Sequence, residues 1–486
     1  MNAPPRTPAQ AAEPAGPTDP PIYTSAYELT ARIRNKELSA VEVTEAVLAR
    51  LEAVNPRLHA VVAVRAEGAL ADARAADALP PEERGPLHGV PFTVKDANES
   101  ADLPVAYGSR PFTGYKPGFE SESVARLRRA GGILVGSTNM PEFGLRITTD
   151  NRAFPATRNP WNTDHSPAGS SGGAAAAVAA GIAPLALAAD GAGSVRAPAS
   201  ACGVVGLKPT RGRTSWAPAS QEQWAGYVVN GPVARTVRDT ALMLDVLAGP
   251  VVGEPYGLPA TPSGTFQAAC DRPPGRLRVA YTCTPPHGAV VPEVRQVFER
   301  AVSAFEALDV EVVEAAPDLG GLLDPLLTVI AANVAAMVRG VPPEHLAELE
   351  PATLDIALHG ERLGAVDYCA AIAAAQNRAA EVLRFWTRYD VLLTPVLTVL
   401  PPPLGAAPAG TGFQERWREY ADWLAFTYPF NITGQPALSL PAGRAGDGLP
   451  VGVQLVGAPG AEAELLGLAA AFERAHPWAD ERPRLG

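Results

Sequence analysis

Residues 169–212 decide the fold, and they read GSSGGAAAAVAAGIAPLALAADGAGSVRAPASACGVVGLKPTRG. The Ala-rich part predicts a helix at about 173–181, and the apolar run after it predicts a strand at 184–190. That strand delivers a bare loop around Ser194. A further strand, ending in a turn, is expected at 203–210. The alternation of helix and strand is the pattern of the α/β class.

Signals for further elements lie on both sides of this stretch. Ser25 with Glu28 and Ser39 with Glu42 form capping boxes, and each opens an amphipathic run that predicts a helix. More helices are expected at 65–79, 122–132, 236–249, 292–309, 364–387 and 461–476. More strands are expected within 85–96 and at 133–136, 276–282, 310–316, 389–396, 434–443 and 449–457. Residues 250–276 predict a long connection, and 401–410 a flexible loop.

Composition limits the classes of function. The chain has 486 residues, of which 47% are hydrophobic, enough for a large buried core. Its net charge of −11 repels phosphate backbones, so we expect no nucleic-acid partner. The longest apolar stretch, 172–189, is rich in Ala and Gly and broken by Pro184, so we expect no membrane span.

The Pro- and Ala-rich residues 1–22 predict a disordered tail without the apolar core of a secretory signal. The four cysteines show neither metal-ligand spacing nor a disulfide framework, and the histidines form no zinc pattern. We therefore expect a reduced, cytoplasmic protein with no metal and no other cofactor. No feature fixes the number of subunits, and a homodimer is consistent with the sequence.

The loop around Ser194 predicts a site for an anion. Gly191, Ala192 and Gly193 carry small side chains, so successive N–H groups can turn toward one point, as an oxyanion requires. Asp190 and Arg196 flank this loop. They form either a solvated ion pair or a brace that holds the loop in shape.

Lys95 is the candidate base, because it stands at the end of the apolar run GVPFTVKD (89–96). Burial disfavours the charged form of lysine and lowers its pKa, and a neutral amine can accept a proton from a serine. The rival serine is Ser171, which fits the pattern G-x-S-x-G of the α/β-hydrolases. That esterase mechanism needs a strand directly before Ser171, which is missing, and a histidine such as His345 or His359.

Residues 169–212 resemble the amidase signature sequence almost from end to end. The resemblance extends over roughly residues 25–480 and includes GVPFTVKD, TNMPEF (138–143), YPFNITGQPALSLPAG (428–443) and LPVGVQLVG (449–457). The segments ATRNPWN (156–162) and HPWADERPRL (476–485) are similar to the branch that contains the aminohexanoate cyclic-dimer hydrolases.

The resemblance implies one large amidase domain over 23–486, with N-terminal helices at 25–80, a signature core at about 85–250 and a mixed, twisted sheet covered by helices. It implies a triad of Ser194 as nucleophile, Ser170 as a bridging serine after a cis peptide bond, and Lys95 as base. The implied oxyanion donors are the N–H groups of Gly191, Ala192, Gly193 and Ser194. Ser171, Asp190 and Arg196 are supporting residues, and Met140 lines the substrate pocket.

The resemblance also implies the activity: hydrolysis of a small carboxylic amide to a carboxylate and ammonia or an amine, with a linear or cyclic amide of the aminohexanoate type as one candidate. Two departures from the family pattern stand out. Ala189 replaces the usual Thr, which removes a hydroxyl near the triad, and Ala192 replaces the usual first Gly of Gly-Gly-Ser. The helical residues 324–338 either line an apolar pocket or pack as core, and we favour packing.

Two other functions compete with a free-standing amidase. One is the A subunit of a tRNA-dependent amidotransferase, whose loop normally continues into Gln after the Arg, where this chain has Ala197. The other is a binding protein on the same fold that has lost activity, which the intact triad positions disfavour.

Overall fold

The computed structural model describes residues 21–485. Residues 1–20 of the predicted tail lie outside the described part, whereas Pro21 and Ile22 belong to a 3₁₀ turn, η1 (Pro21–Tyr23), so the prediction was wrong for these two residues. Among the described residues, no helix combines the length and the apolar character needed to cross a bilayer.

Eleven strands form a single mixed sheet in the order β1-β3-β2-β4-β6-β5-β10-β11-β9-β7-β8. The strands are β1 (Val61–Val64), β2 (Pro91–Lys95), β3 (Ile133–Thr138), β4 (Leu185–Asp190), β5 (Val205–Lys208), β6 (Val229–Ala234), β7 (Arg278–Tyr281), β8 (Glu311–Glu314), β9 (Val391–Pro395), β10 (Ala437–Arg444) and β11 (Pro450–Gly457). Strand β2 runs parallel to both β3 and β4, and the centre of the sheet from β4 to β9 is antiparallel. The predicted α/β class and mixed sheet are confirmed.

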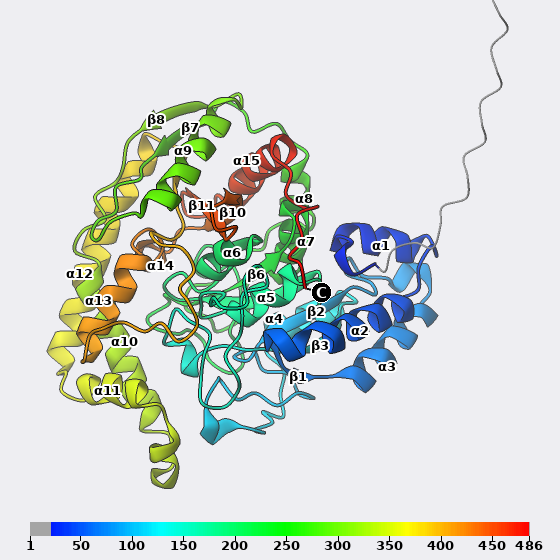
Figure 1. The fold of residues 1–486 in the computed structure, drawn as a ribbon, viewed down its shortest axis with the longest axis horizontal. Coiled ribbons are helices and arrows are strands. Elements are labelled where there is room, and N and C mark those ends of the chain that lie inside the picture. Colours follow the sequence, from blue (N-terminus) through cyan, green and yellow to red (C-terminus); the bar gives the residue numbers. More distant parts are fainter. Residues whose placement is uncertain (1–20, 486) are drawn as a thin grey trace, which may run out of the picture.

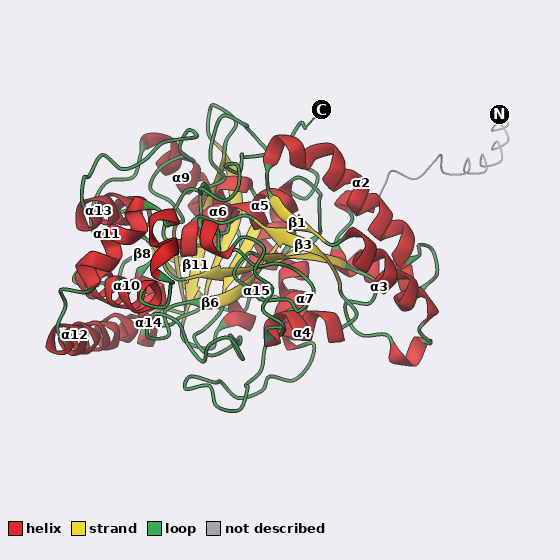
Figure 2. Ribbon diagram, turned by 90° about the horizontal axis from the view of Figure 1, so that it is seen from below, coloured by secondary structure: helices red, strands yellow, loops and turns green. Residues whose placement is uncertain are grey.

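Helices cover both faces of this sheet (Figure 2). They are α1 (Ala26–Arg34), α2 (Ala40–Leu58), α3 (Ala66–Ala78), α4 (Glu122–Arg129), α5 (Gly172–Ala179), α6 (Arg196–Cys202), α7 (Val237–Leu247), α8 (Thr265–Cys270), α9 (Pro292–Glu306), α10 (Leu323–Val338), α11 (Pro351–Gly360), α12 (Ala365–Leu383), α13 (Phe413–Trp423), α14 (Pro429–Thr433) and α15 (Glu462–Ala475). Helices α1 to α3 gather at one end of the molecule and α10 to α13 at the other (Figure 1).

The decisive stretch forms the middle of the core. Every residue of α5 and β4 is buried, and their small side chains let helix and sheet approach closely. A Cβ on Gly172 would lie 2.2 Å from Thr149 Oγ1, and a Cβ on Gly173 would lie 2.4 Å from the backbone N of Asn139. The Ala- and Gly-rich composition of 172–179 therefore reflects tight packing rather than a membrane span.

The sheet also explains why distant residues meet. Because β2 and β4 are parallel neighbours, their carboxyl ends lie at the same edge of the sheet. Lys95 ends β2, and the loop that carries Ser194 follows β4 directly. The polar residues of both strand ends are therefore brought together at the centre of the molecule.

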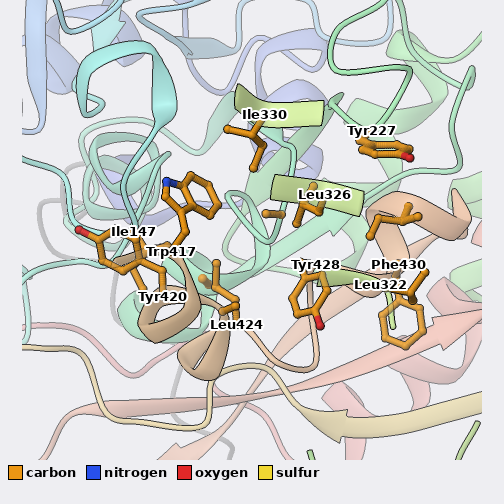
Figure 3. Packing of buried hydrophobic residues seen from close by; sticks show 14 of the residues in the cluster. Ile147, Tyr227, Leu322, Leu326, Ile330, Trp417, Tyr420, Leu424, Tyr428 and Phe430 are labelled. Atoms are coloured by element: carbon orange, nitrogen blue, oxygen red, sulfur yellow. The ribbon is translucent and has the colours of Figure 1, made fainter. Parts of the chain in front are cut away.

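Some elements differ from the sequence-based expectation. Residues 250–276 contain the helix α8, and the elements α6, β6, α11, α13 and α14 were not predicted. Helix α10 packs as core, with Leu326, Leu327 and Ile330 buried in one large cluster, which confirms the packing interpretation of 324–338. The helices α10 and α13 and the residues around Tyr428 share this cluster (Figure 3).

Candidate active site

Lys95 is buried beside the loop that precedes α5. Its Nζ lies 2.7 Å from Ser170 Oγ and 3.5 Å from the carbonyl oxygen of Ala189. Burial lowers the pKa of Lys95 to about 7, although the nearby Asp190 carboxylate acts in the opposite direction. At neutral pH a large share of the Lys95 side chains is therefore uncharged and able to accept a proton.

Ser170 and Ser171 occupy the turn into α5. The Gly169–Ser170 peptide bond is cis, as the resemblance implies. Ser171 is fully buried; its Oγ donates to the Ala189 carbonyl at 3.1 Å, and its N–H donates to the Ser194 carbonyl at 3.1 Å. Ser171 therefore ties the start of α5 to the end of β4 and to the loop that follows it.

The esterase mechanism at Ser171 is wrong. No strand leads directly into Ser171, and its hydroxyl donates to the Ala189 carbonyl of β4. Neither proposed histidine contacts it: His345 Nδ1 lies 2.7 Å from Glu348 Oε1, and His359 Nε2 lies 3.3 Å from Gln414 Nε2. The geometry of a nucleophile elbow is therefore missing.

The loop after β4 presents Ser194 to a cavity. Ser194 is partly exposed, and within residues 21–485 its Oγ has no hydrogen-bond partner, Ser170 Oγ included. The backbone N–H groups of Gly191, Ala192 and Ser194 also lack a protein acceptor in this part of the chain. All three residues line the same cavity as Lys95 and Ser170, so these N–H groups are free to meet a bound oxyanion.

Gly193 departs from the predicted set of donors. Its N–H donates to Asp190 Oδ1 at 2.7 Å, and Gly193 does not line the cavity. The other end of the same peptide group is also fixed, because Thr427 Oγ1 donates to the Ala192 carbonyl at 2.8 Å. Gly193 is needed for its conformation instead: its φ is +132°, and a Cβ there would lie 2.4 Å from Thr427 Oγ1.

Asp190 and Arg196 form a buried brace rather than a solvated pair. Arg196 Nε and Nη2 donate to the two carboxylate oxygens of Asp190, each at 2.9 Å, and both side chains are 0% exposed. Arg196 also donates to Thr427 O at 2.9 Å, Gln454 Oε1 at 2.7 Å and Asn431 Oδ1 at 2.6 Å. Burial alone would raise the pKa of Asp190, but the Arg196 guanidinium holds it below its usual range. The ionised carboxylate therefore fixes the loop to the C-terminal part of the chain.

The residues that hold this brace were not identified from the sequence. Asn431 and Gln454 lie inside the C-terminal segments that carry the family resemblance, and Thr427 lies just before the first of them. All three are buried and polar, flanked by apolar residues. A polar residue inside an apolar run is the one local signal that could have drawn attention to them, because buried polar groups need partners.

The two family departures are accommodated locally. Ala189 offers its carbonyl oxygen, which the side-chain substitution leaves in place, to Lys95 and Ser171. Ala192 does not adopt a positive φ, so an alanine fits there without strain. Gly193, the neighbour with a positive φ, is retained as glycine.

The cavity over Ser194 has a volume of about 580 Å³, including its open mouth. Its walls are mostly aromatic and aliphatic, and they comprise Met140, Phe143, Ile147, Trp216, Trp224, Val228, Trp417 and Leu424, together with the polar residues Gln223 and Arg146. Trp417, Leu424 and Ile147 belong to the buried cluster drawn in Figure 3. Within residues 21–485, no group of three or more His, Cys, Asp and Glu side chains is placed to hold a metal ion.

Comparison with known proteins agrees with this architecture. A family model described as Amidase matches residues 42–466. An acylamidase from Rhodococcus erythropolis is 38% identical over 474 residues, which cover 95% of this chain and 97% of that protein. The 6-aminohexanoate-cyclic-dimer hydrolase of Paenarthrobacter ureafaciens is 37% identical over 476 residues, covering 93% and 95%.

A solved structure of 6-aminohexanoate cyclic dimer hydrolase, complexed with substrate, superimposes with a TM-score of 0.90 at 36% identity, covering 96% of this chain and 99% of that one. The fold, the site and these similarities together define a hydrolase that acts on carbon–nitrogen bonds other than peptide bonds. The chain belongs to the amidase family.

Proposed function

We propose that this amidase cleaves its substrate through an acyl-enzyme on Ser194, with Ser170 as the bridging serine and Lys95 as the general base. The observation that carries the proposal is the 2.7 Å contact between Lys95 Nζ and Ser170 Oγ, in the same cavity as Ser194. A buried lysine with a pKa of about 7 supports it, because a base is most useful when its pKa lies near the working pH.

The reaction begins when Ser194 Oγ attacks the amide carbonyl carbon. Ser170 takes the proton of Ser194 as its own proton passes to the neutral amine of Lys95. The free N–H groups of Gly191, Ala192 and Ser194 stabilise the negative charge on the carbonyl oxygen. The hydrogen bond from Ser194 to Ser170 forms when substrate is bound, since catalytic hydrogen bonds often tighten only in the complex.

The second half of the reaction uses the same groups in reverse. The proton on Lys95 returns through Ser170 to the leaving nitrogen, the C–N bond breaks, and ammonia or an amine departs. Water then gives a proton to the relay and attacks the acyl carbon. The ester bond to Ser194 breaks, and the products are a carboxylate and the regenerated serine.

The cavity walls support an uncharged substrate with apolar groups near the scissile bond. Apart from Lys95, the charged residue that lines the cavity is Arg146, which pairs with the Asp150 carboxylate at 2.6 Å and with Glu350. No unpaired cation is therefore offered to a substrate carboxylate, and burying one without a partner is costly. Cyclic aminohexanoate amides and simple acyl amides carry no charge, whereas linear aminohexanoate oligomers carry an ammonium and a carboxylate. We therefore favour the first two.

The competing functions lack comparable support. Ala197 stands where the amidotransferase subunit normally has Gln; it is fully buried in α6 and faces no cavity around Ser194. A binding protein without activity would have no need for a lysine held at 2.7 Å from a serine in its interior. Co-purification with partner subunits would favour the first alternative, and ligand binding without turnover would favour the second.

Covalent labelling tests the mechanism most directly. A fluorophosphonate probe should label Ser194, as peptide mapping would reveal, and Lys95→Ala should abolish the label. Ser171→Ala serves as the control, because it leaves all three catalytic side chains in place and should still be labelled. A label on any other serine, or one that survives the loss of Lys95, would overturn the assignment of roles.

The cellular compartment and the number of subunits belong to the same proposal. The four cysteines all lie within the described residues and are free thiols, which supports a reducing, cytoplasmic setting. A homodimer and the lack of a nucleic-acid partner stay predictions. Sedimentation analysis would test the first, and a binding assay with DNA and RNA at low salt would test the second.

A further inference from the structure

A second cavity adjoins the cavity over Ser194. Its volume is about 590 Å³, including its mouth, and it is lined by Leu145, Arg146, Thr148, Asp150, Ala352, Ile356, residues 405–408, Arg416, Trp417 and Tyr420. Arg146 and Trp417 line both cavities. The two spaces are therefore separated by a wall that is one side chain thick at these positions.

Trp417 is the larger part of this wall. It is a buried residue of α13, and its indole packs edge-on against Tyr420, with ring centroids 6.1 Å apart. Figure 3 shows Trp417 among Ile147, Tyr420 and Leu424, within the buried cluster. The indole also packs edge-on against Phe413, with ring centroids 6.4 Å apart, so aromatic packing keeps the side chain between the two cavities.

Arg146 is the other part of the wall, and it is fixed by charge. It pairs with Asp150 on its own loop and with Glu350, the residue just before α11, whose side chain is buried. These pairs join the loop over Ser170 to the helical layer that carries Trp417. The wall therefore consists of the packed indole of Trp417 and, beside it, the guanidinium of Arg146, which two carboxylates hold in place.

The positions of the two serines divide the site into a leaving-group side and an acyl side. The leaving nitrogen must face Ser170 and Lys95 to receive its proton, whereas the acyl carbon becomes attached to Ser194. Leu424, the residue after α13, packs against the Ser194 loop, since a Cβ on Gly193 would lie 3.1 Å from Leu424 Cδ2. The end of α13 therefore lies beside the loop that carries Ser194.

We propose that Trp417, seated beside Arg146, is the end wall of the acyl pocket and limits how far an unbranched acyl chain can extend from Ser194. The inference rests on the proposed function, because it assigns the acyl group to Ser194. A longer chain would have to displace the indole from its packing, and burying or excluding a single methylene in such a pocket changes kcat/KM by about 10-fold or more. The space behind the wall would accept that chain if the indole were smaller.

The test is a chain-length series of unbranched primary amides from acetamide to decanamide, with ammonia release as the readout. In the natural protein, kcat/KM should rise with the first methylenes and fall steeply once the chain reaches the wall. Trp417→Leu should raise the ratio of kcat/KM for decanamide to that for butanamide by about 10-fold or more. Trp417→Phe should give an intermediate ratio, and it covers the case in which the leucine variant fails to fold.

Two further variants test whether a change in the ratio is due to the place of Trp417 between the two cavities. Trp423→Leu removes a tryptophan from the same helix that lines neither cavity, so its ratio should match that of the natural protein. Ala352→Phe, added to Trp417→Leu, places a ring in the second cavity and should return the ratio toward the original value.

The outcomes separate this inference from the proposed function. An unchanged ratio in folded Trp417→Leu and Trp417→Phe, with amides still hydrolysed, would overturn the inference alone. Failure of every protein, the natural one included, to release ammonia from any of these amides would count against the proposed function. A gain confined to N-alkyl acetamides of rising amine length would place Trp417 on the leaving-group side and overturn its assignment to the acyl pocket.

Discussion

At the scale of single residues, the mechanism that we propose relies on burial for the chemistry that a histidine provides in many serine hydrolases. An exposed lysine is almost wholly charged at neutral pH and cannot accept a proton. Lys95 loses its hydration shell at the end of β2, and the resulting pKa of about 7 makes the neutral amine available. The Asp190 carboxylate limits this fall in pKa, because it favours the ammonium form.

The first prediction concerns the dependence of activity on pH. The base must be neutral, so kcat/KM for a non-ionising amide should rise as the pH increases through about 7 and should level off above it. Lys95→Met should lower kcat/KM by about 100-fold or more and remove this rise. Rates measured from pH 5 to pH 9 would check both effects. A rate that falls as the pH rises through 7 would contradict the role of Lys95.

The second prediction concerns Thr427, which acts on the oxyanion loop without touching the substrate. Its hydroxyl donates to the Ala192 carbonyl, and this contact orients the N–H groups on either side of that peptide. Thr427→Val should lower kcat by about 10-fold, less than the ~100-fold lost when an oxyanion donor itself is removed, with little change in KM. Thr427→Ser keeps the hydroxyl and should recover most of kcat. Equal losses in both variants would show that Thr427 acts only through packing.

The third prediction compares the two neighbouring small residues of the loop. Gly193→Ala places a Cβ 2.4 Å from Thr427 Oγ1 at a φ of +132°, so it should lower both the melting temperature and kcat strongly. Ala192→Gly restores the usual family residue, and its expected cost is about 0.4–1 kcal/mol of stability from the more flexible unfolded chain. Thermal melts and steady-state kinetics of Gly193→Ala and Ala192→Gly would test both expectations. A Gly193→Ala protein that melts like the natural one would refute the conformational role of this glycine.

At the scale of elements, the sequence predicted most of the periodic or capped elements and also α5 and β4, but it missed α6, β6, α11, α13 and α14. Helix α6 (RAPASAC) is wholly buried, so it lacks the alternation of apolar and polar faces that marks a surface helix. Strand β6 contains Gly231 and Pro232, which argue against a central strand, yet it pairs with β4 and β5. The glycine is required there, because a Cβ on Gly231 would lie 2.1 Å from Leu207 O.

The residues of the candidate site also fall into those that the sequence could predict and those that it could not. Lys95, Ser170 and Ser194 could be predicted, because they stand at strand ends and in glycine-rich loops that resemble a known signature. The supporting partners Thr427, Asn431 and Gln454 could not be predicted, since they contact the loop across more than 200 residues of chain and local patterns do not report such contacts.

The fourth prediction concerns the brace between elements. Arg196 joins the N-terminus of α6 to β11 and to the residues around α14, and all of its partners are buried. Arg196→Met would leave Asp190 ionised and unpaired in the interior, which should lower the free energy of unfolding by about 3–5 kcal/mol. Arg339→Met is the matched control: its pair with Glu361 is exposed, and its loss should cost about 1 kcal/mol or less. Urea denaturation of both variants would test the difference, and similar losses would refute the structural role of the brace.

At the scale of the whole molecule, the site depends on a sheet that joins distant parts of the chain. In the proposed mechanism, β2 brings the base, the turn into α5 brings the bridging serine, and β4 brings the oxyanion loop. The segment from α13 to β11 brings the partners of that loop. The proposed oxyanion donors and the proposed base therefore all come from this one chain. A catalytic metal would perform the same two tasks.

The fifth prediction follows from this self-sufficiency. Because the proposed mechanism assigns proton transfer to Lys95 and charge stabilisation to the free N–H groups, we expect prolonged dialysis against EDTA to leave kcat and KM unchanged. Activity of the dialysed enzyme, with and without added Zn²⁺ or Mg²⁺, would be the measurement, and elemental analysis of the dialysed sample would confirm that metal had been removed. A loss of activity reversed by a single metal ion would mean that the lysine is not the base. The attack on the amide would then have to be driven by a metal-bound hydroxide instead.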